Sequence, residues 1–472
     1  MVFLALSLCI YMKVGSDMLL RFSVANFLSI RDQVEFSMIA TASKKRPLNH
    51  VMKCGKYSVL KGSYLFGANA AGKSSFIKSI YFFKNLALYG VQRVNLDKKY
   101  FRLDDDSANQ PGVFQVDFWI DNHVYSYGFA ISYRSSYILE EWLYEILDDK
   151  EICIFYRGEA ENGRMYWDTD LKFASEEDNA FFDVYRKGIQ NRNSRNVFFL
   201  KDFYNHIDVD KQEYKPFVDT INWLRKIIVV FPDSSYDFIT SFLSDDENKD
   251  LRRSLQEFDT GVEAVQVIKK NIDTERAIPQ KIISRIKHDF IDSGVAALEN
   301  KRKAVFRSPE DLLEIEMNDG EVFSNTLGFN HGNDQDLFEL KDESDGTRRL
   351  IHLLPLLKEA QKEYIIFIDE IDRSLHTMAT ARFIEKIYEF NEGLHTQLIA
   401  TTQDANLLDL NKVRQDEIWF IERNEKHSSE LYPLSKYVVK YSDIKKDYLL
   451  GRYGGIPKFI ETYLDMEQYD GE

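Results

Sequence analysis

Runs in which apolar and polar residues alternate dominate the first third of the chain. Alternation of this kind is typical of strands that bury one face. It predicts two strands near the start, at 20–25 and 33–38, joined by a turn. Strand-like runs follow at 113–120, 124–131, 140–147 and 152–156. Asp121-Asn122 is a hairpin signal between two of these strands. The pattern therefore predicts a β-rich subdomain.

Apolar residues spaced three and four positions apart predict helices in other parts of the chain. This spacing recurs from 75 to 88, across much of 165–205, from 251 to 300 and from 347 to 361. The segment 251–300 has no sustained heptads, so we expect a compact helical insertion there and no long coiled-coil arm.

A continuous apolar run at 57–66 leads directly into GANAAGKS, residues 67–74. The octapeptide fits G-x-x-x-x-G-K-[ST], the phosphate-binding P-loop, and its predicted strand and helix flanks distinguish it from a chance glycine turn. Gly67 and Gly72 allow backbone N–H groups to close around phosphate oxygens at a helix N-terminus, whose dipole favours anions. We expect Lys73 to reach the β- and γ-phosphates and the Ser74 hydroxyl to bind Mg²⁺.

A second apolar run, YIIFIDEID at 364–372, contains Asp369 and Glu370 where the apolar residues end. Such a run is typical of a buried parallel strand that delivers carboxylates to the edge of a sheet. We expect Asp369 to hold Mg²⁺ opposite Ser74 and Glu370 to polarise the attacking water. The alternative is an ordinary strand that ends in a polar turn, and the upstream P-loop argues against it.

A shorter motif, Ser344-Asp345-Gly346-Thr347, opens the helix predicted just before this strand. Ser344 is a suitable N-cap, and Asp345 favours the first helical turn. On its own the motif indicates a helix cap, and only its position beside the acid-tipped strand suggests a role in nucleotide binding.

Composition and charge narrow the classes of partner. The chain has 472 residues, 44% of them hydrophobic, and a net charge of −15, so its surface as a whole repels nucleic acid. Any such contact needs a local basic patch, for which Lys301-Arg302-Lys303 and Arg307 are the candidates. Three scattered cysteines match no disulfide framework or metal site and favour a reducing, cytoplasmic setting.

The apolar start of the chain, 1–14, is too short to span a membrane and lacks the basic region of a signal peptide. We therefore expect no membrane attachment. Our interpretation is an upstream start codon, with Met18 as the natural beginning.

The motifs together resemble those of the ATP-binding-cassette (ABC) ATPases: G-x-N-x-x-G-K-S, S-x-G-T opening a helix, and an apolar run followed by Asp-Glu. The likeness is to the recombination and chromosome-maintenance branch and not to the transporters. More narrowly, the chain resembles the stand-alone ABC-type ATPases of bacterial phage-defence and abortive-infection operons, which are related to the ATPase half of the OLD-family nucleases. Four further segments fit that group: NFLS at 26–29, YSYGF at 125–129, FDTGV at 258–262 and LLGRYGGIP at 449–457.

The resemblance implies an α/β fold class, namely an ABC-type P-loop ATPase head with a mixed sheet and a β-rich subdomain, plus a compact helical insertion. On this basis the chain divides into four parts. They are an upstream extension at 1–17, the N-terminal half of the head at 18–205, a mostly helical insertion at 206–335, and the C-terminal half of the head at 336–472.

The resemblance also implies an assembly in which two heads pack head to tail. ATP bound at one P-loop would meet the Ser344–Thr347 segment of the other head, and Asp372 would lie in the D-loop that links the two sites. The implied cofactors are ATP and Mg²⁺. The implied nucleotide-binding residues are Gly67, Asn69, Gly72, Lys73, Ser74, Ser75, Ser344, Gly346, Thr347 and Asp372.

One position departs from the family pattern. After the strand predicted at 397–400 the family usually has T-T-H, whose His senses the γ-phosphate, whereas this chain has Thr401-Thr402-Gln403. Gln403 can hydrogen-bond phosphate or water but cannot carry a proton, so we expect slow hydrolysis or a long-lived ATP-bound state. Gln110 and Gln115 are candidates for the Q-loop residue.

The chain after Gln403 is too short for a TOPRIM nuclease domain of the OLD type. We therefore expect an ATP-dependent dimer or higher oligomer that acts as sensor or regulator of a separate toxin or nuclease in antiviral defence. Two alternatives stay open. One is a RecF-like DNA-repair ATPase that binds DNA directly, and the other is an ATP-gated scaffold that barely hydrolyses.

Overall fold

The computed structural model describes residues 17–41, 48–148, 150–159, 165–191, 195–232, 245–274, 278–291, 303–307, 312–318, 321–333, 335–439 and 444–457. The apolar start at 1–14 and the basic pair Lys301-Arg302 lie outside the described residues. Asp17, which was assigned to the upstream extension, is buried, and its Oδ2 lies 2.7 Å from Lys226 Nζ. The head therefore includes this residue.

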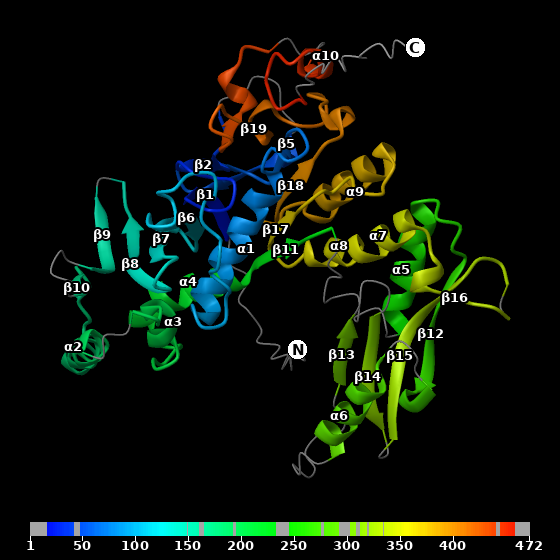
Figure 1. The fold of residues 1–472 in the computed structure, drawn as a ribbon, viewed down its shortest axis with the longest axis horizontal. Coiled ribbons are helices and arrows are strands. Elements are labelled where there is room, and N and C mark those ends of the chain that lie inside the picture. The colour runs from blue at the N-terminus through cyan, green and yellow to red at the C-terminus, as the bar shows by residue number, and fades with distance from the viewer. Residues whose placement is uncertain are drawn as a thin grey trace, which may run out of the picture.

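A six-stranded sheet joins the two halves of the chain, in the order β11-β17-β18-β5-β19-β20 (Figure 1). Its strands are β11 (Ile227–Val230), β17 (Ile365–Ile368), β18 (Gln397–Thr402), β5 (Gly62–Phe66), β19 (Ile418–Arg423) and β20 (Ser429–Pro433). The first five run parallel, and β20 is antiparallel at the edge. Every residue of β5, β17 and β18 is buried, as is typical of parallel strands that are covered on both faces.

A seven-stranded antiparallel sheet forms the β-rich subdomain, in the order β10-β9-β8-β7-β6-β1-β2. Its strands are β1 (Met18–Ala25), β2 (Val34–Ser37), β6 (Gly112–Ile120), β7 (His123–Ser132), β8 (Tyr137–Ile146), β9 (Glu151–Glu159) and β10 (Met165–Asp168). The two strands predicted from alternation and the four predicted from strand-like runs are confirmed. A separate hairpin pairs β3 (Val51–Cys54) with β4 (Tyr57–Leu60).

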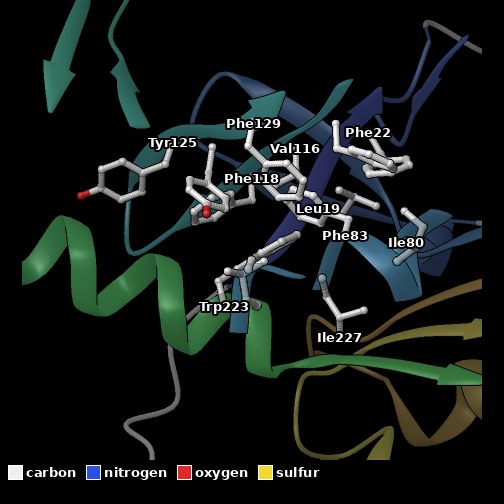
Figure 2. Packing of buried hydrophobic residues seen from close by; sticks show 14 of the residues in the cluster. Leu19, Phe22, Ile80, Phe83, Val116, Phe118, Tyr125, Phe129, Trp223 and Ile227 are labelled. Atoms are coloured by element: carbon white, nitrogen blue, oxygen red, sulfur yellow. The ribbon is translucent and has the colours of Figure 1, made fainter. Parts of the chain in front are cut away.

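Aromatic side chains pack two helices against this sheet (Figure 2). Phe83 of α1 (Lys73–Tyr89) stacks on Phe129 of β7, with ring centroids 5.2 Å apart. Trp223 of α4 (Lys215–Arg225) stacks on Phe118 of β6 at 4.4 Å. Such pairs contribute about 0.5–1.5 kcal/mol each beyond the area they bury. They hold α1, the helix that follows the P-loop, in a fixed position.

The predicted helical insertion is wrong in both composition and boundary. It contains α5 (Asp245–Glu257) and α6 (Gln280–Ile291), but also a sheet in the order β12-β15-β14-β13, with β16 (Phe338–Glu339) paired to β15. The strands are β12 (Ala264–Asn271), β13 (Lys303–Arg307), β14 (Leu312–Asn318) and β15 (Glu321–Asn330). The boundary at 206 also fails, because α4 and β11 belong to the head.

Three other predicted elements are divided in the structure. The run at 57–66 breaks at Lys61 into β4 and β5, which belong to different sheets. The helix at 347–361 breaks into α7 (Asp345–Leu353) and α8 (Pro355–Glu359), because proline cannot donate the hydrogen bond of a helix interior. The segment 165–205 begins with strand β10 before α2 (Glu176–Asn191) and α3 (Phe199–Tyr204). The remaining helices are α9 (Thr377–Phe390) and α10 (Ile444–Leu449).

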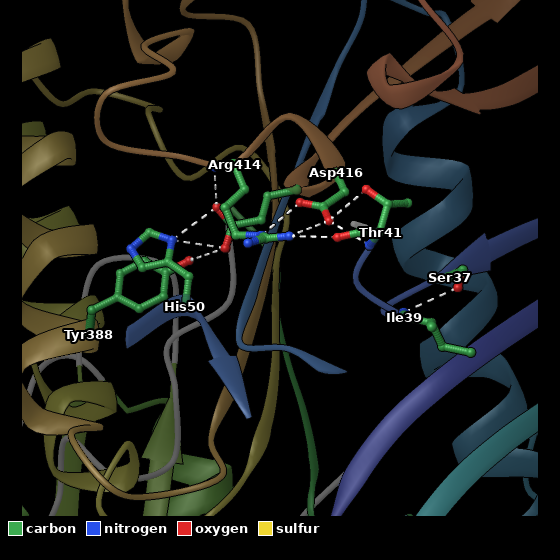
Figure 3. A network of polar contacts seen from close by, with 8 residues as sticks. Ser37, Ile39, Thr41, His50, Tyr388, Arg414 and Asp416 are labelled. Carbon is green, nitrogen blue, oxygen red and sulfur yellow. Dashed lines mark hydrogen bonds and ion pairs between the residues drawn. The ribbon is translucent and has the colours of Figure 1, made fainter. Parts of the chain in front are cut away.

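A buried polar network fastens the start of β19 (Figure 3). The Glu417 carboxylate lies 2.9 Å from His50 Nδ1 and accepts from Tyr388 Oη at 3.2 Å and from Arg414 N at 2.7 Å. Arg414 Nη2 in turn donates to Asp416 at 2.6 Å. Burial raises the pKa of Glu417, and these partners offset the cost of removing its charge from water. The network thereby fixes the strand that ends at Arg423.

Candidate functional site

The loop between β5 and α1 has the shape that the P-loop motif predicts. Gly72 has φ 114°, and a Cβ there would lie 2.0 Å from Ser429 Oγ and 2.8 Å from Ser29 Oγ. A Cβ on Gly67 would lie 2.4 Å from the Ile421 carbonyl oxygen. Only glycine fits either position, so the backbone can close tightly around a bound group.

The Lys73 side chain folds back onto the loop. The side chain is buried, and its ammonium donates to the carbonyl oxygens of Gly67 at 2.5 Å and Ala68 at 3.0 Å. Burial lowers the pKa of Lys73, whereas the negative charges of Asp372, Glu370 and Asp369 act in the opposite direction. The acids at the end of β17 therefore lie near this lysine, as the sequence predicted.

The two acids at the end of β17 are held by one threonine. Asp369 is 2% exposed, and its Oδ1 accepts from Thr401 Oγ1 at 2.7 Å. The Glu370 N–H donates to the same Thr401 Oγ1 at 2.8 Å, and Glu370 has φ 50°. Thr401 lies on the neighbouring strand β18, so the register of two parallel strands sets both carboxylates.

Arg349 of α7 also holds this corner, and sequence reasoning missed it. Its Nη2 donates to the carbonyl oxygens of Asp369 at 3.2 Å and Glu370 at 3.0 Å. Burial lowers the pKa of the Arg349 guanidinium to about 10. The helix that begins with the Ser344 motif is thus tied to the backbone of Glu370.

The Gln403 backbone is tied to the predicted D-loop. Its N–H donates to Asp372 Oδ2 at 3.0 Å, while its side chain is exposed. Gln403 follows β18, which lies between the P-loop strand β5 and the acid-tipped strand β17. The Gln403 side-chain amide can therefore contact a ligand that extends from the end of β5 to the end of β17.

A pocket of about 470 Å³ gathers most of the predicted site. The predicted residues that line it are Asn69, Gly72, Lys73, Ser74, Ser75, Glu370 and Gln403. Four lining residues were not predicted: Ser29, Ala68, Ala70 and Arg423. Ser29 belongs to the NFLS segment singled out in the sequence, but nothing local marks Arg423, which reaches the loop only through the pairing of β19 with β5.

The remaining predicted residues lie outside the lining of this pocket. Gly67 and Asp369 are buried behind it, and neither Gln110 nor Gln115 borders it. Ser344 is exposed as the N-cap of α7, where its Oγ accepts from Thr347 N at 3.1 Å. A Cβ on Gly346 would lie 3.0 Å from the Ser374 carbonyl oxygen, so this turn packs directly on the D-loop. One chain therefore does not bring the Ser344–Thr347 segment, or the Asp372 side chain, into its own pocket.

The oxygen donors beside Lys73 fit Mg²⁺. Ser74 lines the pocket, and the Asp369 carboxylate is close enough to act on the pKa of Lys73. Within the described residues, no group of three or more His, Cys, Asp or Glu side chains is arranged to hold a metal. A site with few protein ligands suits Mg²⁺, which takes one or two protein oxygens together with phosphates and water.

A family model matches residues 64–409, which contain the loop, both acids and Gln403. Its description is "AAA domain, putative AbiEii toxin, Type IV TA system". The chain belongs to this family. The matched residues thus include the P-loop, Glu370 and Gln403 of the pocket and strands β11, β17 and β18, whereas Ser29 and Arg423 of the pocket and strands β1, β2, β19 and β20 lie outside them.

The solved structures that resemble this chain include three that it matches over almost their whole length. They are an SMC head bound to the C-terminal winged-helix domain of ScpA (TM-score 0.36, 13% identity, 89% of this chain and 98% of that chain), the SMC head domain from Thermotoga maritima (0.33, 12%, 88% and 98%), and the recombination mediator RecF with ATP (0.33, 12%, 89% and 99%). These values are too low to transfer a partner or substrate to this AAA-family chain. Comparison with curated protein sequences finds no match. Among the described helices, none combines the length and apolarity needed to cross a membrane.

Proposed function

We propose that this AAA-family chain is an ABC-type ATPase in which two copies enclose ATP, and that it controls a separate toxin or nuclease in antiphage defence. One observation carries the proposal: a single pocket collects Lys73 and Ser74 from the loop, Glu370 from β17 and Gln403 from β18. These residues come from three elements far apart in the sequence. Each has the chemistry that one part of triphosphate hydrolysis requires.

The role of each residue follows from its chemistry. The Lys73 ammonium would bind the β- and γ-phosphates, and the Glu370 carboxylate would orient and polarise the attacking water. Ser74 and Asp369 would hold Mg²⁺, which neutralises charge on the phosphate oxygens when bound. Gln403 would hydrogen-bond the γ-phosphate or the water without taking a proton, which favours slow turnover.

The exposure of Ser344 supports the assembly part of the proposal. The Ser344–Thr347 turn packs on the D-loop that follows β17, yet it does not line the pocket of its own chain. A second copy packed head to tail would bring this turn over the neighbouring nucleotide. The Ser344 hydroxyl and the N-terminus of α7 would then face phosphate oxygens, which is a favourable position for an anion.

The first experiment is Lys73→Ala, with ATP affinity measured by calorimetry. Loss of the charge that faces the phosphates is expected to weaken binding by roughly 100-fold. Lys78→Ala is the matched control, because Lys78 is exposed on the same helix and does not line the pocket. Unchanged ATP affinity of Lys73→Ala would rule out this site.

A second experiment addresses the biological role. The family description reads "putative AbiEii toxin, Type IV TA system", which supports a place for this chain in a toxin-based defence system. The chain is expressed with its neighbouring reading frames in a phage-sensitive host, and protection is expected to be lost with Lys73→Ala and kept with Lys78→Ala. Turnover stimulated by duplex DNA, without any protection from phage, would instead favour a DNA-repair ATPase.

A further inference from the structure

Ser29 and Arg423 form the wall of the pocket that lies across the loop from Glu370. In the central sheet, β17 and β18 lie on one side of β5, whereas β19 and β20 lie on the other. Glu370 and Gln403 follow the first pair of strands, and Arg423 ends β19. Ser29 lies with this second pair, because the Ser429 N–H of β20 donates to its carbonyl oxygen at 2.8 Å.

The positions of these residues indicate how a nucleoside triphosphate would be oriented in the pocket. The water that attacks the γ-phosphate must lie beside Glu370, so the γ end points toward β17 and β18. Lys73 and the loop N–H groups take the middle of the phosphate chain. The nucleoside end then extends to the opposite wall, where Arg423 and Ser29 lie.

The Arg423 guanidinium is available to contact a nucleotide base. Its side chain is exposed, and within the part of the chain that the structure describes no carboxylate lies within ion-pair distance of it. None of the described residues that line the pocket is aromatic, so a base has no ring to stack on. A guanidinium is planar, weakly hydrated and stacks well on aromatic faces.

We propose that Arg423 is the specificity-determining residue of the nucleoside subsite, where its guanidinium stacks on a purine base. Purines are favoured over pyrimidines because they offer the larger face. This inference rests on the proposed function, since it assigns the second half of the same pocket. Arg423 lies on the wall opposite Glu370, so we expect its replacement to change the affinity for nucleotides more than the affinity for the phosphates alone.

The test compares three probes by calorimetry: ATP, CTP and inorganic tripolyphosphate, which has the phosphates without the nucleoside. Arg423→Ala is expected to weaken ATP binding roughly tenfold, to reduce the preference for ATP over CTP, and to leave tripolyphosphate binding within about twofold. Arg423→Lys keeps the charge but not the plane, and is expected to resemble Arg423→Ala.

Lys426→Ala is the matched control, because Lys426 is an exposed cation in the turn of the same hairpin and does not line the pocket. Equal losses for ATP and tripolyphosphate would make Arg423 a phosphate ligand and overturn the inference, as would wild-type ATP affinity in Arg423→Ala. These outcomes leave the proposed function intact. If the wild-type chain binds neither ATP nor tripolyphosphate, the proposed function itself fails.

Discussion

Glu370 adopts a backbone conformation that few side chains tolerate. Its φ of 50° lies in the left-handed region, which is sparsely populated for residues other than glycine. Thr401 Oγ1 accepts from its N–H, and Arg349 donates to its carbonyl oxygen. The direction of the carboxylate is therefore set by its neighbours, as suits a residue that must hold a water molecule in one orientation.

Replacing this carboxylate with the amide of the same shape separates binding from chemistry. Glu370→Gln is expected to keep ATP affinity within about twofold and to lower turnover by roughly 100-fold or more, because only polarisation of the water is lost. The ATP-bound assembly should then accumulate, as measured by light scattering after size-exclusion chromatography. Glu425→Gln, at an exposed position, is the control. Normal turnover in Glu370→Gln would exclude this role.

Residues of the site that are contiguous in sequence could be predicted, and those assembled by distant pairing could not. Lys73, Ser74 and Glu370 lie in short motifs whose spacing reports the chemistry directly. Arg423 lines the pocket because β19 lies beside β5. Arg349 extends from helix α7 to the carbonyl oxygen of Asp369, just after β17. Nothing in the residues next to either arginine indicates these contacts.

The element that most directly couples the proposed interface to the chemistry is α7. It starts at the exposed Ser344 turn, and four residues into the helix Arg349 donates to the carbonyl oxygens of Asp369 and Glu370. A second copy that contacts Ser344 would therefore contact the helix whose Arg349 is bonded to Glu370, the residue proposed to polarise the water. Arg349 is a positioning residue, since it acts through the backbone of Glu370.

Loss of this anchor should lower kcat more than affinity. Arg349→Met removes the charged donor to both carbonyl oxygens, and such bonds contribute about 1.5–3 kcal/mol. We expect turnover to fall about tenfold or more, ATP affinity to stay within about threefold, and Arg349→Lys to recover part of the activity. Arg382→Met is the control, because Arg382 is a half-buried arginine on α9 that pairs with Glu389 and does not line the pocket. A change in ATP affinity alone, with normal kcat, would contradict the positioning role.

The strands of the antiparallel sheet in the first third of the chain were predicted well, and those of the insertion were not. Strands β6, β7 and β8 have nine or ten residues each and are rich in aromatic and β-branched residues. Strand β12 has the sequence AVQVIKKN, in which Val265 and Ile268 also fit helical spacing. Its pairing with β15, more than fifty residues away, decides the outcome. Short apolar runs do not contain that information.

At the scale of the whole molecule, the proposed composite site needs two copies of the chain. The pocket opens on the loop side of β17 and β5, and the Ser344 turn is exposed beside the D-loop. A head-to-tail pair would contain two such sites, each built from both chains. ATP would then stabilise the assembly, and hydrolysis would release it.

Mixing two inactive variants tests this arrangement. Ser344→Arg places a bulky cation at the exposed turn and is expected to block ATP-dependent assembly, while each chain still binds ATP with near wild-type affinity. Lys73→Ala lacks the opposite half of the site. A mixture of the two should regain one intact composite site per pair, and turnover up to about half that of wild type measures it. Wild-type assembly by Ser344→Arg, or no recovery in the mixture, would argue against the two-chain site.

One contact beside the pocket joins two parts of the chain that lie far apart in the sequence. Ser429 Oγ donates to the Ala71 carbonyl oxygen at 2.7 Å and lies 2.8 Å from Ser29 Oγ. The phosphate loop is thus buttressed by a strand that is synthesised 358 positions later. A growing polypeptide that has not yet released β20 from the ribosome lacks this support. The protein should consequently gain its ligand-ready loop only after β20 has been made and has paired with β19.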